Sequence, residues 1–139
     1  MKICNPKQIA RAWVVFQRNW WAHNQVVALC REHPKKAWAL LQHLLVLANT
    51  KDLILDVGAG PLEDFIRAHA STYIKRIELL AANNVRFRKA LRNVWIPAGK
   101  DDATMRLVKL GCMPLELTNK KKTESVARFA PQDAPPPEP

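Results

Sequence analysis

The fold of this chain depends on how one stretch is interpreted, Asp56-Val57-Gly58-Ala59-Gly60-Pro61-Leu62-Glu63-Asp64. Preceded by Leu53-Ile54-Leu55, it can be a buried strand followed by a glycine turn that approaches a nucleotide cofactor. It can also be the joint between two helices, because glycine often ends a helix and proline often begins one. The choice separates a cofactor-dependent enzyme from a helical binding module.

The strand interpretation resembles the opening segment of a class I methyltransferase. Such a segment has a further glycine after Gly60, where this chain has Pro61 and Leu62. It also needs an acidic residue at the end of a second strand about 20 residues on. Glu78 has that distance, but the apolar spacing of residues 73–80 fits a helix better. A methyltransferase-like fragment is therefore kept only as an alternative.

The helical interpretation accounts for the same residues locally. A short helix over residues 51–57 would end at Gly58, which adopts the left-handed conformation at low steric cost. Gly60 would cap the next helix, and Pro61 would occupy its first position, where a missing N–H costs nothing. Glu63 would reach back to the cap and complement the positive end of that helix. We therefore predict a helical joint.

The other long apolar patterns also have the helical period, and none alternates as a strand does. Helix boundaries are expected at Asn5-Pro6, His33-Pro34, Asn49-Thr50, Ser71 or Thr72, Asn83-Asn84, Asp101 or Asp102, and Gly111. One helix is expected to bury Phe87, Ala90, Leu91, Val94 and Trp95. Because the connections are short, neighbouring helices should be antiparallel. We predict an all-α fold, a compact array of about six to eight short antiparallel helices.

The composition changes near the C-terminus. Residues 1–117 are predicted to form a single helical domain, and residues 118–139 a Lys/Pro-rich tail. Lys120-Lys121-Lys122 lies in this tail, and five of the ten prolines lie between Pro131 and Pro139. Such a segment buries too little apolar surface to fold alone, so the tail is expected to be disordered.

Cysteine usage and hydropathy predict a cytoplasmic protein. Cys4, Cys30 and Cys112 are odd in number and scattered, which argues for a reducing compartment. No apolar run approaches the ~20 residues that cross a membrane. The apolar run Trp13–Phe16 is too short for a signal peptide.

The net charge of +10 is unevenly distributed. Residues 1–50 carry seven basic and one acidic side chain, and residues 67–100 carry eight basic and one acidic. Residues 51–66, between them, carry one basic and four acidic side chains. Two basic blocks predict an anionic partner, either a protein with an acidic surface or a nucleic acid. The alternative is that these side chains only solvate the outer faces of helices.

The pattern resembles an uncharacterised family of small bacterial helical proteins, a domain of unknown function. The four matching segments are Ala37–Leu47, the Ala-Gly-Pro-Leu-Glu-Asp start at Ala59–Asp64 followed by Phe65-Ile66 and His69, Ile74–Glu78, and the Phe-Arg-x-x-Leu-x-x-Val-Trp segment Phe87–Trp95. The family often has glycine where this chain has Ala70, and proline near Val85. The resemblance implies an all-α domain and implies no activity.

No catalytic, cofactor-binding or metal-binding residue is predicted. Glu63, Asp64 and His69 are the nearest approach to a cluster of titratable groups. Glu63 is explained by capping, and His69 is expected to be a partly buried histidine with a backbone partner. Cys30 and His33 lack the paired ligand spacing of a structural zinc site.

Two groups of residues are candidates for contact with a partner. Trp20 and Trp21 are adjacent, so on a helix they point about 100° apart and one is expected to be exposed. The alternative is that both are wedged between helices. The basic candidates are Arg86, Arg88, Lys89 and Arg92. These residues point to a non-catalytic protein-interaction module, such as an inhibitor, an immunity-like protein or a phage or regulatory adaptor. A nucleic-acid-binding protein is the alternative.

Overall fold

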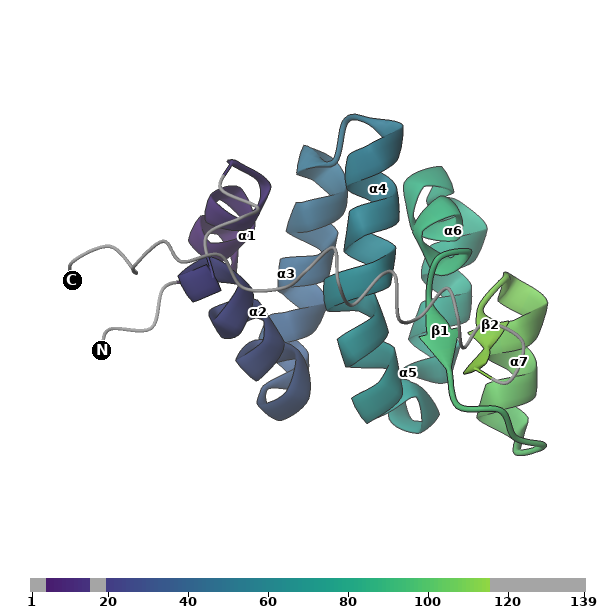
Figure 1. Ribbon diagram of the computed structural model, residues 1–139. Helices are drawn as coiled ribbons and strands as arrows, with labels where there is room; N and C mark the ends of the chain where they lie inside the picture. The colour runs from purple at the N-terminus through teal and green to yellow at the C-terminus, as the bar shows by residue number, and fades with distance from the viewer. Residues whose placement is uncertain (1–4, 16–19, 116–139) are drawn as a thin grey trace.

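The computed structural model describes residues 5–15 and 20–115, which form seven α-helices, one π-helical segment and two short strands. The helices stand side by side in a row, from α1 at one end to α7 at the other (Figure 1). They are α1 (Pro6–Val15), α2 (Trp20–Glu32), α3 (Pro34–Leu47), α4 (Lys51–Val57), α5 (Glu63–Asn83), α6 (Val85–Leu91) and α7 (Asp102–Leu110). The π-helical segment is η1 (Gly58–Leu62), and the strands are β1 (Trp95–Ile96) and β2 (Met113–Pro114). The predicted all-α array is confirmed, whereas the predicted tail at residues 118–139 lies outside the described residues.

Local capping chemistry fixes the starts of the helices where the sequence predicts them. The Asn5 side chain accepts from the backbone N–H of Gln8 at 2.8 Å, and the Gln8 side chain accepts from the backbone N–H of Asn5 at 3.2 Å. This reciprocal pair is a capping box at the start of α1. Thr50 caps α4 in the same way, because its hydroxyl accepts from the backbone N–H of Leu53 at 3.2 Å.

Both predicted ends of α7 are also confirmed. The Asp101 carboxylate accepts from the backbone N–H of Thr104 at 3.1 Å and from the Thr104 hydroxyl at 2.7 Å. Gly111 ends the helix with φ at 115°, in the left-handed region that glycine adopts without steric cost.

The joint at Gly58 differs from the prediction. Gly58 has φ −63° and ψ −47°, so it continues α4 in a right-handed helix instead of ending it. Gly60 caps no new helix, because η1 joins α4 to α5 without a break. Pro61 lies inside this segment, where the wider π turn accommodates the missing N–H. The glycine at position 58 has a packing role: a Cβ there would lie 2.1 Å from the carbonyl oxygen of Ala90.

The continuous helical run formed by α4, η1 and α5, residues 51–83, bends back on itself, and we call it the bent helix. A straight helix from Gly58 to Asn83 would be about 38 Å long. Ala90, seven residues beyond Asn83, nevertheless lies against Gly58. The rings of Phe65 and Tyr73 are 5.0 Å apart, although residues eight apart are separated by about 12 Å along a straight helix. The chain therefore reverses direction within α5, at the lower end of the row in Figure 1.

Two predicted boundaries are consequently wrong. No helix starts at Ser71 or Thr72, because the helical backbone continues to Asn83 and the chain turns by bending. Glu63 is no capping residue at a helix start, because helical backbone precedes it. Its side chain is only 4% exposed, and its Oε1 accepts from the backbone N–H of Trp95 at 2.8 Å.

The predicted helix from Phe87 to Trp95 ends early, at Leu91. Trp95 and Ile96 instead form β1, which pairs in parallel with β2. The backbone N–H of Met113 donates to the carbonyl oxygen of Val94 at 2.8 Å. The residues predicted to be buried in this segment are buried. The last of them, Trp95, is held by the pairing of β1 with β2 and not by a helix.

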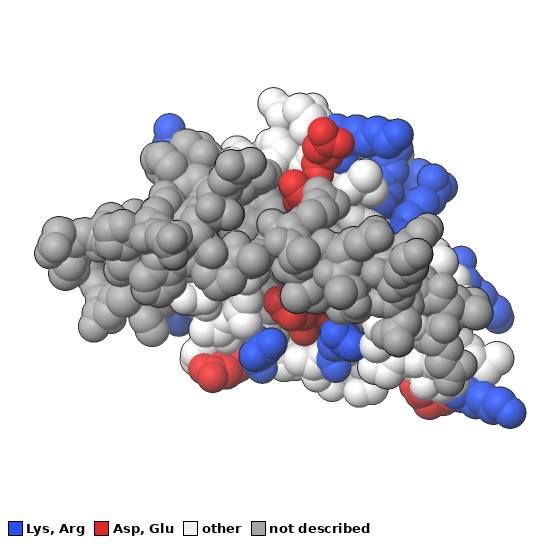
Figure 2. All heavy atoms as spheres, in the orientation of Figure 1, with Lys and Arg blue, Asp and Glu red and all other residues white. Residues whose placement is uncertain are grey.

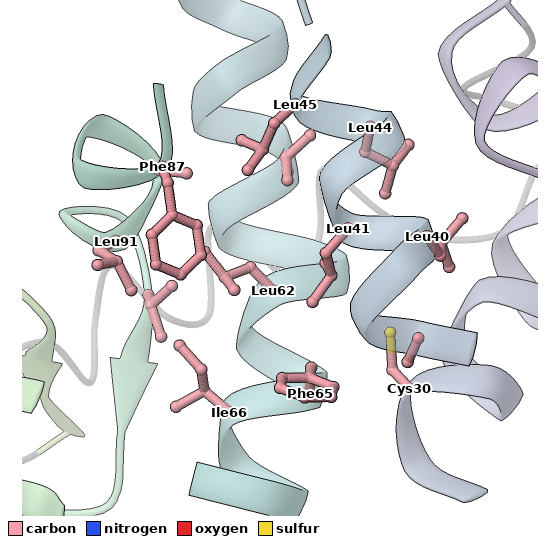
Figure 3. Packing of buried hydrophobic residues seen from close by; sticks show 14 of the residues in the cluster. Cys30, Leu40, Leu41, Leu44, Leu45, Leu62, Phe65, Ile66, Phe87 and Leu91 are labelled. Atoms are coloured by element: carbon pink, nitrogen blue, oxygen red, sulfur yellow. The ribbon is translucent and has the colours of Figure 1, made fainter. Parts of the chain in front are cut away.

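The hydrophobic core includes buried residues from all seven helices, and Figure 3 shows its part around α3, the bent helix and α6. Its fully buried residues include Leu41 and Leu45 of α3, Leu62 of η1, and Phe87 and Leu91 of α6. Trp38 of α3 is partly buried beside this core, and its ring packs on the rings of Phe65, Tyr73 and Phe87 at 5.6, 5.6 and 6.2 Å. The core thus holds α6 in place along one side.

Candidate functional site

The basic helix α6 has one buried and one solvent-facing side. Its buried residues are Phe87, Ala90 and Leu91. Val85, Lys89 and Arg92, spaced four and three apart, lie together on the opposite side of the helix. Arg92 directly follows the last helical residue and keeps a right-handed conformation, with φ −65° and ψ −17°. All three residues are exposed, although the aliphatic stem of Arg92 also lies against Gly111 at the end of α7. We call them the α6 stripe.

Arg86, on one flank of the α6 stripe, is bound to helix α3. Its Nη1 donates to the carbonyl oxygens of Leu45 and Val46, each at 2.9 Å. These carbonyls belong to the last turn of α3, where helical carbonyls lack partners within the helix. Arg86 therefore caps α3 and fixes α6 to it.

Arg88, on the other flank, binds the end of α5 in the same manner. Its Nη1 donates to the carbonyl oxygen of Ala81 at 2.7 Å and is 3.4 Å from that of Ala82. Asn93 also turns toward a neighbouring helix, because its Nδ2 donates to the carbonyl oxygen of Leu55 at 2.9 Å. The structure thus separates the basic candidates: Arg86 and Arg88 bind backbone carbonyls, and Lys89 and Arg92 lie on the α6 stripe.

The surface around the α6 stripe combines positive charge with aliphatic side chains. Lys and Arg side chains gather on the side of the molecule where α6 lies, and residues 85–92 contain no acidic residue (Figure 2). Val85 is 54% exposed. Val46, whose carbonyl oxygen binds Arg86, is 74% exposed. Exposed cations beside exposed valines can bind a partner that offers both carboxylates and apolar groups.

Trp20 and Trp21 stand at the start of α2. Their backbone is helical, as predicted, and their side chains lie outside the described part of the structure. Their role as partner contacts stays a prediction.

A second group of charged residues lies between α2 and α5, which pack on each other. Burial raises the pKa of Asp64, while the charges of Arg31, His23 and Arg67 oppose that rise. Burial lowers the pKa of His23, and the charge of Asp64 opposes this. The sequence interpretation missed this carboxylate–imidazole pair, because it joins residues 41 positions apart.

Cys30, in the same region, is a poor nucleophile. Its side chain is fully buried, and burial, with a smaller contribution from the Asp64 charge, raises the pKa of its thiol well above the usual range. A thiol reacts as the thiolate, which this environment disfavours. Cys112 is similar, since burial raises the pKa of its thiol to about 12.

The prediction for His69 is confirmed. Its Nε2 lies 2.8 Å from the carbonyl oxygen of Cys30, and the residue is partly buried. The His69 ring also contacts the rings of Phe65 and Tyr73 at 5.2 and 6.5 Å. His69 thus ties α5 to the end of α2 through a backbone partner.

A groove of about 240 Å³ lies between α5, the loop after β1, and α7. Ile66 and Leu107 supply buried apolar side chains to it. Arg67 and Ser71 line one side and Asp101 the other. Because Asp101 already caps α7, its carboxylate is engaged within the fold.

The structure also bears on the enzyme alternative and on metal and membrane binding. Leu53, Ile54 and Leu55 lie in α4, so the strand interpretation of this stretch, which a methyltransferase cofactor site requires, is wrong. Within residues 5–15 and 20–115, no three His, Cys, Asp or Glu residues are placed to hold a metal ion. In the same residues, no helix combines the length and the apolar character needed to span a membrane.

Comparison with known proteins supports the resemblance seen in the four sequence segments. No curated protein and no solved structure is similar enough to this chain to count as a match. A family model does match, over residues 13–112, and its span includes the bent helix, α6 and α7. The chain therefore belongs to DUF6869, a family of unknown function.

Proposed function

We propose that this protein is a non-catalytic interaction module that docks on an acidic surface of a partner protein through the α6 stripe and Val46. The observation that carries the proposal is the pairing of the exposed cations Lys89 and Arg92 with the exposed Val85 on one side of α6. Inhibitors, immunity-like proteins and regulatory adaptors act by this kind of docking.

The rigid placement of α6 supports this function. Arg86 binds the end of α3 and Arg88 binds the end of α5, so α6 is held from both flanks. The close contact of Gly58 with Ala90 fixes the buried side of α6 against the bent helix. A surface that is already ordered loses less conformational entropy on binding, which raises affinity.

The exposed valines favour a protein over a nucleic acid as the partner. A phosphate backbone offers no apolar group for Val46 and Val85 to contact, whereas a protein surface does. We propose a cytoplasmic location, which the buried free thiols of Cys30 and Cys112 support.

Cross-linking followed by affinity purification from the native cells tests the proposal. Lys89→Glu with Arg92→Glu should abolish recovery of the partner protein. Lys35→Glu with Lys36→Glu is the matched control, because it changes the net charge equally at exposed positions in the first turn of α3. Recovery that survives the α6 change, or recovered material that nuclease removes, would contradict docking on a protein through α6.

A further inference from the structure

We infer that the partner segment is an acidic amphipathic helix lying along the α6 stripe, with two carboxylates one helical turn apart on Lys89 and Arg92 and an aliphatic residue on Val85. The inference rests on the proposed function and narrows it to one kind of binding segment. It also assigns different roles to the four basic residues of this surface.

The shape of the surface favours a helix as the ligand. The α6 stripe is a ridge along a helix, about 10 Å long from Val85 to Arg92. Residues four apart on such a ridge fit the groove between side-chain ridges of a second helix. A two-turn helical segment is therefore long enough to cover the α6 stripe.

The spacing of charges on the α6 stripe matches that of a helix. Lys89 and Arg92 are three residues apart, so their Cβ atoms are separated by about 5–6 Å. Two carboxylates three or four residues apart on a facing helix have the same separation. An aliphatic residue one further turn along that helix would meet Val85, which is 54% exposed.

Arg86 and Arg88 are positioning residues in this arrangement. Their guanidinium groups donate to the final carbonyls of α3 and α5, so they orient α6 and keep the α6 stripe facing outward. Lys89 and Arg92 are then the cations that contact the partner. This division separates variants that change affinity from variants that change stability.

The test is a fluorescence anisotropy titration of the full chain with a side-chain-stapled helical peptide of about 14 residues, since unstapled helices of this length are marginal in water. Two glutamates and two leucines occupy one face of the peptide. A control peptide carries the same residues with the glutamates and leucines on opposite faces. Polyglutamate and a mixed-sequence DNA duplex are the other probes.

We expect the one-faced helical peptide to bind more tightly than the control peptide and polyglutamate. Lys89→Glu with Arg92→Glu should weaken its binding at least about tenfold. Val85→Ser should also weaken it, whereas Val108→Ser, at another exposed valine, should not. Arg86→Met and Arg88→Met should lower the melting temperature and leave affinity at low temperature within about threefold.

Each other outcome overturns a defined part of the account. Equal binding of polyglutamate and the helical peptide would overturn the helical ligand and leave docking on an acidic protein surface intact. Binding that persists in the Lys89→Glu, Arg92→Glu variant, or no peptide binding at all, would overturn the assignment to the α6 stripe. Tight DNA binding lost in that variant, without peptide binding, would overturn the proposed function as well.

Discussion

At the scale of single residues, the contact between Gly58 and Ala90 explains why a glycine stands inside a continuous helix. Glycine in a helix is less stable than alanine by about 1 kcal/mol, so the helix alone would favour alanine at position 58. The carbonyl oxygen of Ala90 occupies the space that a Cβ would need. Glycine lowers the stability of the helix itself, but it allows α6 to pack closely against position 58.

Gly58→Ala should therefore destabilise the protein, by about 3 kcal/mol, because overpacking against a backbone carbonyl outweighs the gain in helix propensity. Denaturant unfolding followed by circular dichroism measures the change. Lys75→Gly compared with Lys75→Ala, at an exposed position in α5 beyond the bend, gives the propensity effect alone and should cost about 1 kcal/mol. A Gly58→Ala variant more stable than the wild type would show that α6 does not pack here.

Glu63→Ala should cost about 3 kcal/mol, because it leaves the buried backbone N–H of Trp95 without its carboxylate acceptor and opens a cavity. Glu63→Gln should cost less, since the amide oxygen can still accept from Trp95. Melting temperatures of both variants give the order. Equal losses would indicate that the negative charge of Glu63, and not its acceptor oxygen, supports the fold.

His23 should make folding sensitive to mild acid. Burial lowers the pKa of His23 below its usual 6.5, so between these two values the unfolded chain binds a proton that the folded chain does not. Its contribution to stability is complete above pH 6.5 and is lost as the pH falls toward the folded pKa. Asp64 acts in the opposite direction, because its raised pKa adds stability as the pH falls toward 3.8.

The measurement for this prediction is the free energy of unfolding at about pH 7.5 and about pH 5.5, on either side of the usual histidine pKa. The wild type should lose more stability between these two pH values than His23→Gln does. An equal loss in both proteins would show that His23 does not titrate differently in the folded state.

At the scale of elements, α6 shows how a short helix is fixed by its neighbours. Seven residues are too few for a stable isolated helix, so its position depends on tertiary contacts. Phe87, Ala90 and Leu91 bury one side, and Arg86 and Arg88 bind the ends of α3 and α5. A docking surface must be held in a fixed position, because a partner contacts several of its side chains at once.

Arg86→Met and Arg88→Met should each reduce stability by about 1 kcal/mol, the net value of a hydrogen bond on a partly exposed surface. The methionine keeps much of the aliphatic stem, so the loss reports the guanidinium contacts. Thermal unfolding measures it. Lys89→Met should have little effect on stability, and a loss there as large as at Arg86 would contradict the separation of roles.

Element starts were predictable where a local side-chain cap creates them. Asn5, Thr50 and Asp101 each accept from a backbone N–H three residues on, which short-range chemistry alone predicts. The joint at Gly58 was not predictable in this way, because the reason for its glycine is the carbonyl of Ala90, 32 residues later. The non-helical conformation of Trp95 was unpredictable for a similar reason, because its backbone N–H donates to Glu63, which is distant in the sequence.

At the scale of the whole molecule, the helices form a row in which the bent helix brings α6 back against α4 and α3 (Figure 1). The basic candidates of the site were visible in the sequence as charges without a structural explanation. Their division into Arg86 and Arg88, which bind carbonyls, and Lys89 and Arg92, which face outward, depends on where α3 and α5 end in space. Helical periodicity predicted the buried side of α6 but not these long-range partners.

The most direct test of docking through α6 is a two-dimensional NMR titration of the isotope-labelled chain with the one-faced acidic helical peptide. Docking through α6 predicts chemical-shift changes concentrated at Val46, Val85, Lys89 and Arg92, with Lys35 and Lys36 unaffected. Shift changes centred on the groove between α5 and α7, at Arg67 and Thr104, would contradict docking through α6.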